Sequence, residues 1–240
     1  LNLNGMWDYA LRPRNEDCPQ TFDGRILVPF PIESALSGVK KFVDPDHRLW
    51  YRRTFETPAA WRGRRVFLHF GAVDWEATVW VNGRRVAFHE GGYDPFTADI
   101  TSALAGRGPQ ELVVAAWDPS DSGFQPRGKQ VLKPEGIWYT PTTGIWQTVW
   151  IEPVNAASIA ELKLTPDVDT GSLRVTVACE GVSAAAKVAV KVIDGGKTVA
   201  EGSAAPGTAF SIPIKNPKLW SPDTPFLYDI KATLDRKSVG

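Results

Sequence analysis

The sequence predicts an all-β protein made of two sandwich domains, and three observations support this expectation. The apolar runs are short, rich in β-branched and aromatic residues, and separated by Gly, Pro and Asn. No window of about 11 residues or more keeps a helical hydrophobic period. The chain has 240 residues, which is enough for two β domains.

In the first part of the chain, three runs of strand length are rich in β-forming residues: 65–70, 77–81 and 112–117. Asn82 and Gly83 follow the second of these runs and precede another, at 84–88. Since Asn-Gly supplies the positive φ angles of a type I′ turn, we expect a hairpin there. The best helical segment is a single turn at 101–105, with Thr101 as its expected N-terminal cap.

The composition changes near Pro153, and the predicted domains are residues 1–153 and 154–240. Only Trp220 of the ten Trp falls in the second domain. Its apolar runs alternate strictly, which indicates strands with one buried face, at 173–177, 187–193 and 210–214. With turns at 169–171 and 194–196, this pattern favours an immunoglobulin-like sandwich. We expect one more strand beyond residue 240, so the sandwich lacks its last strand.

Charge and hydropathy exclude several classes of partner. Lys and Arg together number 27, as do Asp and Glu, which argues against nucleic acid as a partner. No apolar run reaches about 18 residues, so no membrane span is expected. The start of the chain, Leu1-Asn2-Leu3-Asn4, has no charged and apolar leader, so no signal peptide is expected. Cys18 and Cys179 are 161 positions apart in different predicted domains, and we expect no disulfide.

No cofactor or metal site is expected from the sequence. The three histidines, His47, His69 and His89, have no metal-ligand spacing, and no glycine-rich phosphate motif is present. His89 and Glu90 could suggest acid–base catalysis, but the Gly91-Gly92 pair that follows favours a tight β connection.

Several segments of the chain carry motifs in the order and spacing of one enzyme family. They are Leu3-Asn4-Gly5-Met6-Trp7; Leu49-Trp50-Tyr51-Arg52-Arg53; Phe70-Gly71-Ala72-Val73-Asp74 with Val79-Trp80-Val81-Asn82-Gly83 and His89-Glu90-Gly91-Gly92-Tyr93; Thr143-Gly144-Ile145-Trp146; and Leu219-Trp220-Ser221-Pro222. Over essentially its whole length, the chain resembles the N-terminal half of family-2 glycoside hydrolases, the β-galactosidase, β-glucuronidase and β-mannosidase group.

This resemblance implies a galactose-binding-like jelly roll at 1–153, followed by the immunoglobulin-like β-sandwich at 154–240. In the family a (β/α)8 barrel follows and carries two catalytic glutamates, and such a barrel needs about 250 further residues. The resemblance therefore implies no catalytic residue in this chain. Its expected partners are the barrel of the parent enzyme and a carbohydrate substrate. Enzymes of this kind often use complex polysaccharides, which favours a periplasmic or extracellular location, but nothing in this chain indicates export.

The resemblance also points to site residues. Asp74, which Trp75 follows, stands where related β-galactosidases carry an active-site Asn, so Asp74 is expected to accept a hydrogen bond from a sugar hydroxyl. The alternative is that Asp74 only stabilises its own turn.

A second candidate region is the loop at 129–144, which contains Trp138 and Tyr139. We expect these rings to wall the substrate pocket and stack on a sugar, although they could instead pack the seam between the domains. Trp138 stands where relatives carry an active-site Asp, which puts that polar contact in doubt. Nearby, Arg127-Gly128-Lys129-Gln130 could hold an anionic sugar group or form a solvated loop.

Three functions remain open from the sequence. The first is the non-catalytic front of a glycosidase, since none of the 27 acidic residues sits in a motif that places two carboxyl groups in one cleft. The second is a stand-alone carbohydrate-binding module that uses Trp on the jelly roll. The third is a purely structural pair of sandwiches.

Overall fold

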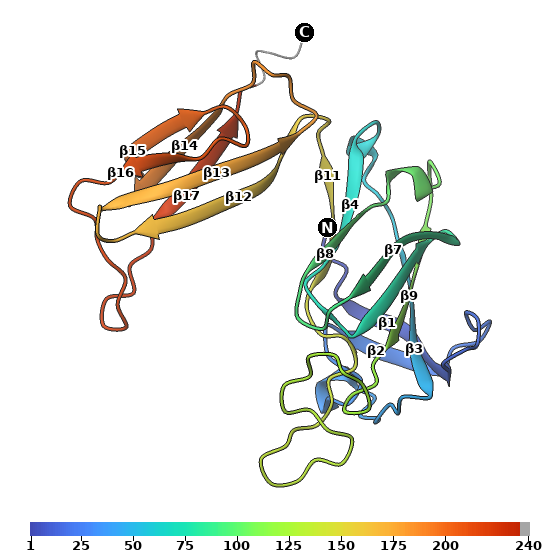
Figure 1. Cartoon of the computed structure of the whole chain (residues 1–240). Coiled ribbons are helices and arrows are strands. Elements are labelled where there is room, and N and C mark those ends of the chain that lie inside the picture. Colours follow the sequence, from blue (N-terminus) through green and yellow to red (C-terminus); the bar gives the residue numbers. More distant parts are fainter. Residues whose placement is uncertain (236–240) are drawn as a thin grey trace. The chain divides into compact units, whose positions relative to one another are not determined.

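The computed structural model describes residues 1–235 and divides into two compact units. The first unit is Leu1–Val154, and the second begins at Asn155. Both units are built from antiparallel strands (Figure 1), so the all-β prediction is confirmed. The further strand expected beyond residue 240 lies outside the described residues.

The first unit contains one large sheet and two smaller ones. The six-stranded sheet has the order β2 (Gly24–Val28), β1 (Gly5–Pro13), β3 (His47–Phe55), β9 (Gln110–Trp117), β6 (Glu76–Val81) and β7 (Arg84–Glu90). A three-stranded sheet has the order β11 (Val149–Val154), β4 (Arg65–Phe70) and β8 (Phe96–Asp99). The short strands β10 (Gly144–Ile145) and β5 (Val73–Asp74) pair with each other. Three 3₁₀ turns join these elements: Ala35–Ser37, Ala59–Trp61 and Thr101–Ala103.

One hydrophobic core lies between the six-stranded and three-stranded sheets. Alternate residues of each strand point into it, as in Trp7 of β1, Tyr51 of β3 and Phe70 of β4, which are all fully buried. The buried indole of Trp7 donates from Nε1 to the carbonyl of Leu3 at 2.9 Å, so its polar atom is satisfied. Two antiparallel sheets packed over one core form the predicted jelly-roll sandwich.

The structure tests two local predictions in this unit. The hairpin is confirmed, because Asn82 (φ 49°) and Gly83 (φ 75°) form the turn between β6 and β7. The expected cap at Thr101 is wrong. Ile100 is the N-cap residue, and the Thr101 hydroxyl donates to the Asp99 carboxylate instead. A cap oxygen must accept from an N–H of its own turn, whereas the Thr101 oxygen accepts from the backbone N–H of Val66 in β4.

The second unit is a sandwich of two three-stranded sheets. One has the order β12 (Ser158–Asp167), β13 (Ser172–Glu180) and β16 (Phe210–Pro213); the other has the order β15 (Lys197–Ala204), β14 (Val188–Asp194) and β17 (Asp229–Leu234). Their inner faces form a small core around Val175, Val190 and Ile212, so the immunoglobulin-like prediction is confirmed. Cys18 and Cys179 are both free.

The close approach of Gly144 to Tyr51 gives a prediction about stability. Gly144 has φ 90°, and a Cβ there would lie 2.0 Å from the buried Tyr51 hydroxyl. Gly144→Ala is expected to destabilise the first unit by about 2 kcal/mol or more, from backbone strain and overpacking together. Urea unfolding followed by Trp fluorescence measures the change.

The matched control is Gly83→Ala, because Gly83 also has positive φ but would place its Cβ in open space. In that variant the free energy of unfolding is expected to fall only by the cost of backbone strain, about 1–2 kcal/mol. Equal losses in the two variants would contradict the steric role of Gly144.

Candidate functional site

A long irregular segment connects β9 to β10, and we call residues 118–143 the aromatic loop. It is the region coloured green to yellow in Figure 1 that carries no strand arrow. Within it, the backbone of Tyr139 donates to the Lys129 carbonyl at 2.8 Å, and Val131 donates to the Tyr139 carbonyl at 3.0 Å. These two bonds close the loop on itself, so the sequence prediction of a loop is confirmed.

Asp74 lies at the base of this loop. It ends β5 opposite Gly144 of β10, the Asp74–Trp75 peptide bond is cis, and the Asp74 side chain is nearly inaccessible at 3% exposure. Its Oδ2 accepts a hydrogen bond from Nε2 of Gln130 at 3.3 Å. A Cβ on Gly92 would lie 2.5 Å from Oδ1, so only glycine allows that segment to cover the carboxyl group.

Gln130 connects Asp74 to the far end of the loop. While its Nε2 donates to Asp74, its Oε1 accepts from the backbone N–H of Thr142. The same Nε2 lies 3.5 Å from the Tyr93 hydroxyl, which is a longer contact. The amide of Gln130 therefore joins three separate segments at one point.

Two further buried carboxyl groups hold the end of the loop. Glu33 accepts from the backbone N–H of Thr143 at 3.0 Å, and Asp118 accepts from the Thr143 hydroxyl at 3.2 Å. The backbone N–H of Ser120 also donates to Asp118, at 2.7 Å. Both carboxyl groups are almost entirely buried. Thr143 is thus held from two sides, directly before β10.

Burial and mutual repulsion change how these groups titrate. Burial, followed by the charge of Asp118, raises the pKa of Asp74 to about 7. Burial also raises the pKa of Glu33 to about 7, and it raises the pKa of Asp118. Nothing in the sequence spacing of these residues predicts the cluster. The only signal is that Asp74 ends one strand and Asp118 directly follows another.

The loop exposes its aromatic side chains. Trp138 is 42% exposed and Tyr139 is 63% exposed, and Ile137 beside them is exposed as well. The Lys129 ammonium lies 5.7 Å from the centre of the Tyr139 ring. Nε of Arg127 is buried and has no hydrogen-bond partner among the described residues. The first unit therefore presents an apolar, partly cationic surface at this loop.

Other residues singled out from the sequence have structural partners. The half-buried Trp75 donates its backbone N–H to the Trp117 carbonyl at 3.3 Å. The ring of His89 stacks on Phe96 at 4.4 Å, with Nε2 3.2 Å from the Gly91 carbonyl. This position supports the expectation of a tight β connection at His89.

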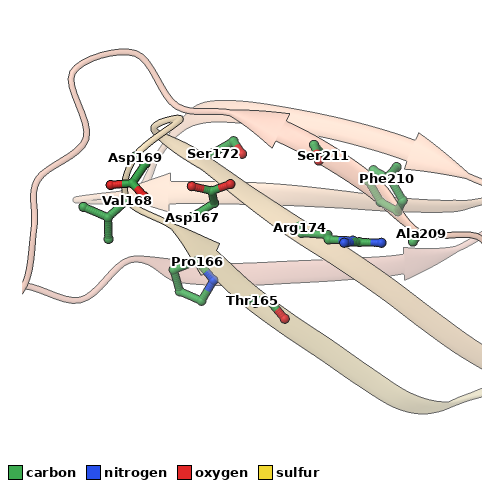
Figure 2. Close-up of a pocket in the computed structure, with 10 residues that line it drawn as sticks. All are labelled: Thr165, Pro166, Asp167, Val168, Asp169, Ser172, Arg174, Ala209, Phe210 and Ser211. Carbon is green, nitrogen blue, oxygen red and sulfur yellow. The ribbon is translucent and has the colours of Figure 1, made fainter.

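A cavity lies in the second unit (Figure 2). It has a volume of about 650 Å³ and runs along β12, β13 and β16. Asp167 and Asp169 lie at its turn end, and Arg174 and Phe210 line its length. None of the residues predicted to contact sugar lines it, so it is separate from the candidate site.

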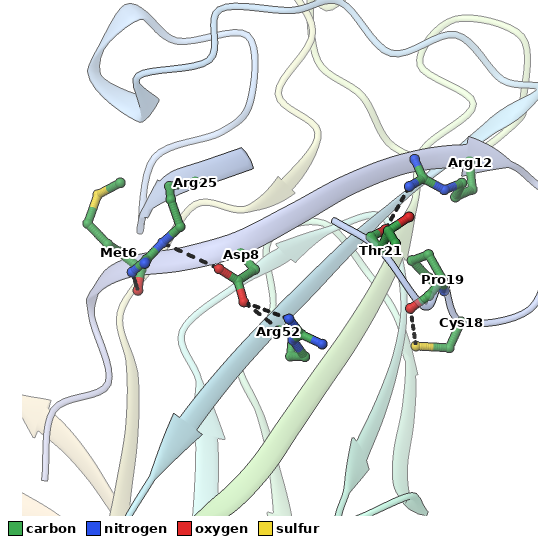
Figure 3. A network of polar contacts seen from close by, with 8 residues as sticks. All are labelled: Met6, Asp8, Arg12, Cys18, Pro19, Thr21, Arg25 and Arg52. Atoms are coloured by element: carbon green, nitrogen blue, oxygen red, sulfur yellow. Dashed lines mark hydrogen bonds and ion pairs between the residues drawn. The ribbon is translucent and has the colours of Figure 1, made fainter. Parts of the chain in front are cut away.

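The second face of the six-stranded sheet bears a tryptophan pair. Trp50 stacks on Trp80 with ring centres 5.6 Å apart, and Trp50 is buried. On the same face, Asp8 pairs with Arg52 at 3.1 Å and with Arg25 at 3.5 Å (Figure 3). These contacts tie neighbouring strands together and leave Trp50 without an open ring face for a glycan.

Within residues 1–235, no helix is long and apolar enough to cross a bilayer. Over the same residues, no group of three or more His, Cys, Asp or Glu side chains is placed to hold a metal ion.

The raised pKa values predict a pH dependence of stability. A carboxyl group whose pKa is raised by folding stabilises the fold fully below its ordinary pKa, and this stabilisation is lost as pH rises through about 7. Between about pH 5 and 7, the free energy of unfolding of the first unit is expected to fall by at most about 1.4 kcal/mol per pH unit for each group.

Urea unfolding at several pH values tests this expectation. Asp74→Asn, which cannot ionise, is expected to give a shallower slope than the unchanged chain. Identical slopes would show that Asp74 does not titrate in this range.

Two family models match the chain in succession. The model described as glycosyl hydrolases family 2, sugar binding domain, matches residues 1–151. The model described as glycosyl hydrolases family 2 matches residues 157–239. Together they cover nearly the whole chain.

Curated relatives match the sequence of this chain over only part of their own length. A β-glucuronidase of Paenibacillus borealis is 29% identical over 97% of this chain and 42% of its own length. A β-galactosidase of Thermoanaerobacter pseudethanolicus is 28% identical over 98% of this chain and 33% of its own. The chain thus spans less than half of these proteins.

Solved structures show the same fold. The β-glucuronidase of Ruminococcus gnavus in complex with C6-substituted uronic isofagomine has a TM-score of 0.78 at 22% identity, over 98% of this chain and 42% of that one. The β-glucuronidase of Faecalibacterium prausnitzii has a TM-score of 0.76 at 26% identity, over 98% and 44%. On the two successive family models, the chain belongs to glycosyl hydrolase family 2.

Proposed function

We propose that these 240 residues are the non-catalytic part of a longer glycosidase that hydrolyses O-glycosidic bonds in β-linked carbohydrates. The family membership and the shared names of the relatives, β-glucuronidase and β-galactosidase, support this proposal. So does the share of those proteins that the chain spans, because more than half of their length lies outside it.

The role we propose is to brace a catalytic (β/α)8 barrel and to contribute part of the wall of its substrate pocket. The observation that carries this proposal is the aromatic loop, which is fixed at its base by buried hydrogen bonds and exposes Trp138 and Tyr139. Large exposed aromatic side chains on an ordered loop are typical of a surface that a partner or ligand covers.

Trp138 and Tyr139 are the residues that we propose to contact the sugar. An indole or phenol ring offers a flat apolar face for a pyranose and one polar atom for a hydroxyl group. Trp75 and Asp74 lie at the base of the same loop. The sugar contact expected for Asp74 stays a prediction.

The first experiment tests whether catalysis requires residues beyond these 240. The 240-residue chain alone is expected to show no turnover of aryl β-galactosides, β-glucuronides or β-mannosides, because we place the catalytic carboxyl groups in the barrel. The same chain extended by the coding sequence that follows it is expected to cleave at least one of them. Turnover by the 240 residues alone that survives repurification would contradict the proposal. An extension without a strand–helix pattern would favour a stand-alone carbohydrate-binding module.

The second experiment tests the pocket wall in the extended protein. Trp138→Ala is expected to lower kcat/KM about 2- to 10-fold, since an aromatic contact contributes about 0.5–1.5 kcal/mol. The melting temperature is expected to stay unchanged because the ring is 42% exposed. Trp220→Ala is the control, as Trp220 is an exposed tryptophan of the second unit. Equal kinetics for the two variants would remove Trp138 from the proposed pocket.

A further inference from the structure

We infer that Asp74 and Gln130 act as a positioning pair, which holds the aromatic loop in the shape that presents Trp138 and Tyr139. In this role the Asp74 carboxyl group serves the loop and not the sugar directly. The contribution of the pair to substrate binding rests on the function proposed above, whereas its effect on the loop does not.

The contacts of Gln130 carry the first step. Its side-chain amide has one donor group and one acceptor atom, and both are used inside the protein, by Asp74 and by the N–H of Thr142. Trp138 and Tyr139 lie between positions 130 and 142. Fixing both positions to one amide removes much of the freedom of the chain between them.

The surroundings of Asp74 carry the second step. Its carboxyl group is 3% exposed, with Gly92 packed against Oδ1 and Gln130 bonded to Oδ2. Among the described residues, no ion pair joins it to Lys or Arg. Asp118 and Glu33 add negative charge nearby, which favours the neutral carboxyl form. A covered, uncharged group of this kind is suited to hold a neighbouring amide.

The third step excludes the local alternative. If Asp74 only stabilised its own turn, its carboxyl oxygens would accept from backbone N–H groups of residues just after it. Its hydrogen bond instead reaches Gln130, 56 positions away in the sequence. The pair therefore joins the sheet to the loop.

Amide hydrogen exchange in the 240-residue chain tests the pair directly. Gln130→Ala and Asp74→Leu each remove the bond between them, and exchange in the peptide 131–143 is expected to become about tenfold faster. Asp74→Asn keeps an acceptor oxygen for Gln130 and is expected to retain the protection. Gln147→Ala, at an exposed glutamine, is the matched control and is expected to change nothing.

Two results would overturn the inference. One is unchanged exchange at 131–143 in both Gln130→Ala and Asp74→Leu. The other is an equal rise in the exchange rate of the core strand β4, which would show general unfolding and not a loosened loop.

Kinetics of the extended protein separate positioning from sugar contact. If the pair positions the loop, Gln130→Ala and Asp74→Leu each lower both kcat/KM and the protection of the loop against exchange. Asp74→Asn is then expected to keep both near the values of the unchanged protein. A lowered kcat/KM in Asp74→Leu with unchanged exchange would contradict the inference and support a direct sugar contact. A protein that cleaves no glycoside would refute the proposed function and leave the exchange result standing.

Discussion

The burial of three carboxyl groups, which within residues 1–235 form no ion pair with Lys or Arg, is the constraint on which the candidate site depends. A buried carboxylate is costly unless it is hydrogen-bonded or protonated. Glu33 and Asp118 find their donors in Thr143 and Ser120, while Asp74 finds its donor in Gln130. All three donor residues belong to the aromatic loop, and so does Asp118, so displacing the loop would leave the buried carboxyl groups of Glu33 and Asp74 without these donors.

This constraint explains how an irregular segment of the protein can present aromatic side chains in a defined way. Ordering a loop of this length costs much conformational entropy, and its few backbone hydrogen bonds offset little of that cost. The buried anchors act at its two ends and at Gln130, next to the rigid sheets of the jelly roll. Trp138 and Tyr139 can then stay exposed without the loop collapsing over them, as a surface that meets a partner requires.

Local chemistry allowed much of the fold to be predicted from the sequence. Asn82-Gly83 encodes its own turn geometry, and the alternation at 187–193 encodes one buried face of β14. The carboxyl cluster could not be predicted, because Glu33, Asp74 and Asp118 meet only through the tertiary fold. The cap at Thr101 failed for a related reason, since its hydroxyl oxygen accepts from the backbone N–H of Val66, 35 positions away.

The most direct test of the central claim, that the aromatic loop faces a catalytic domain, is hydroxyl-radical footprinting. Oxidation rates of Trp138 and Tyr139 are compared in the 240-residue chain and in the extended protein, with exposed Tyr and Trp residues outside the loop as references. We predict that both loop residues become protected in the extended protein while the references keep their rates. Equal oxidation of Trp138 and Tyr139 in the two proteins would contradict the claim.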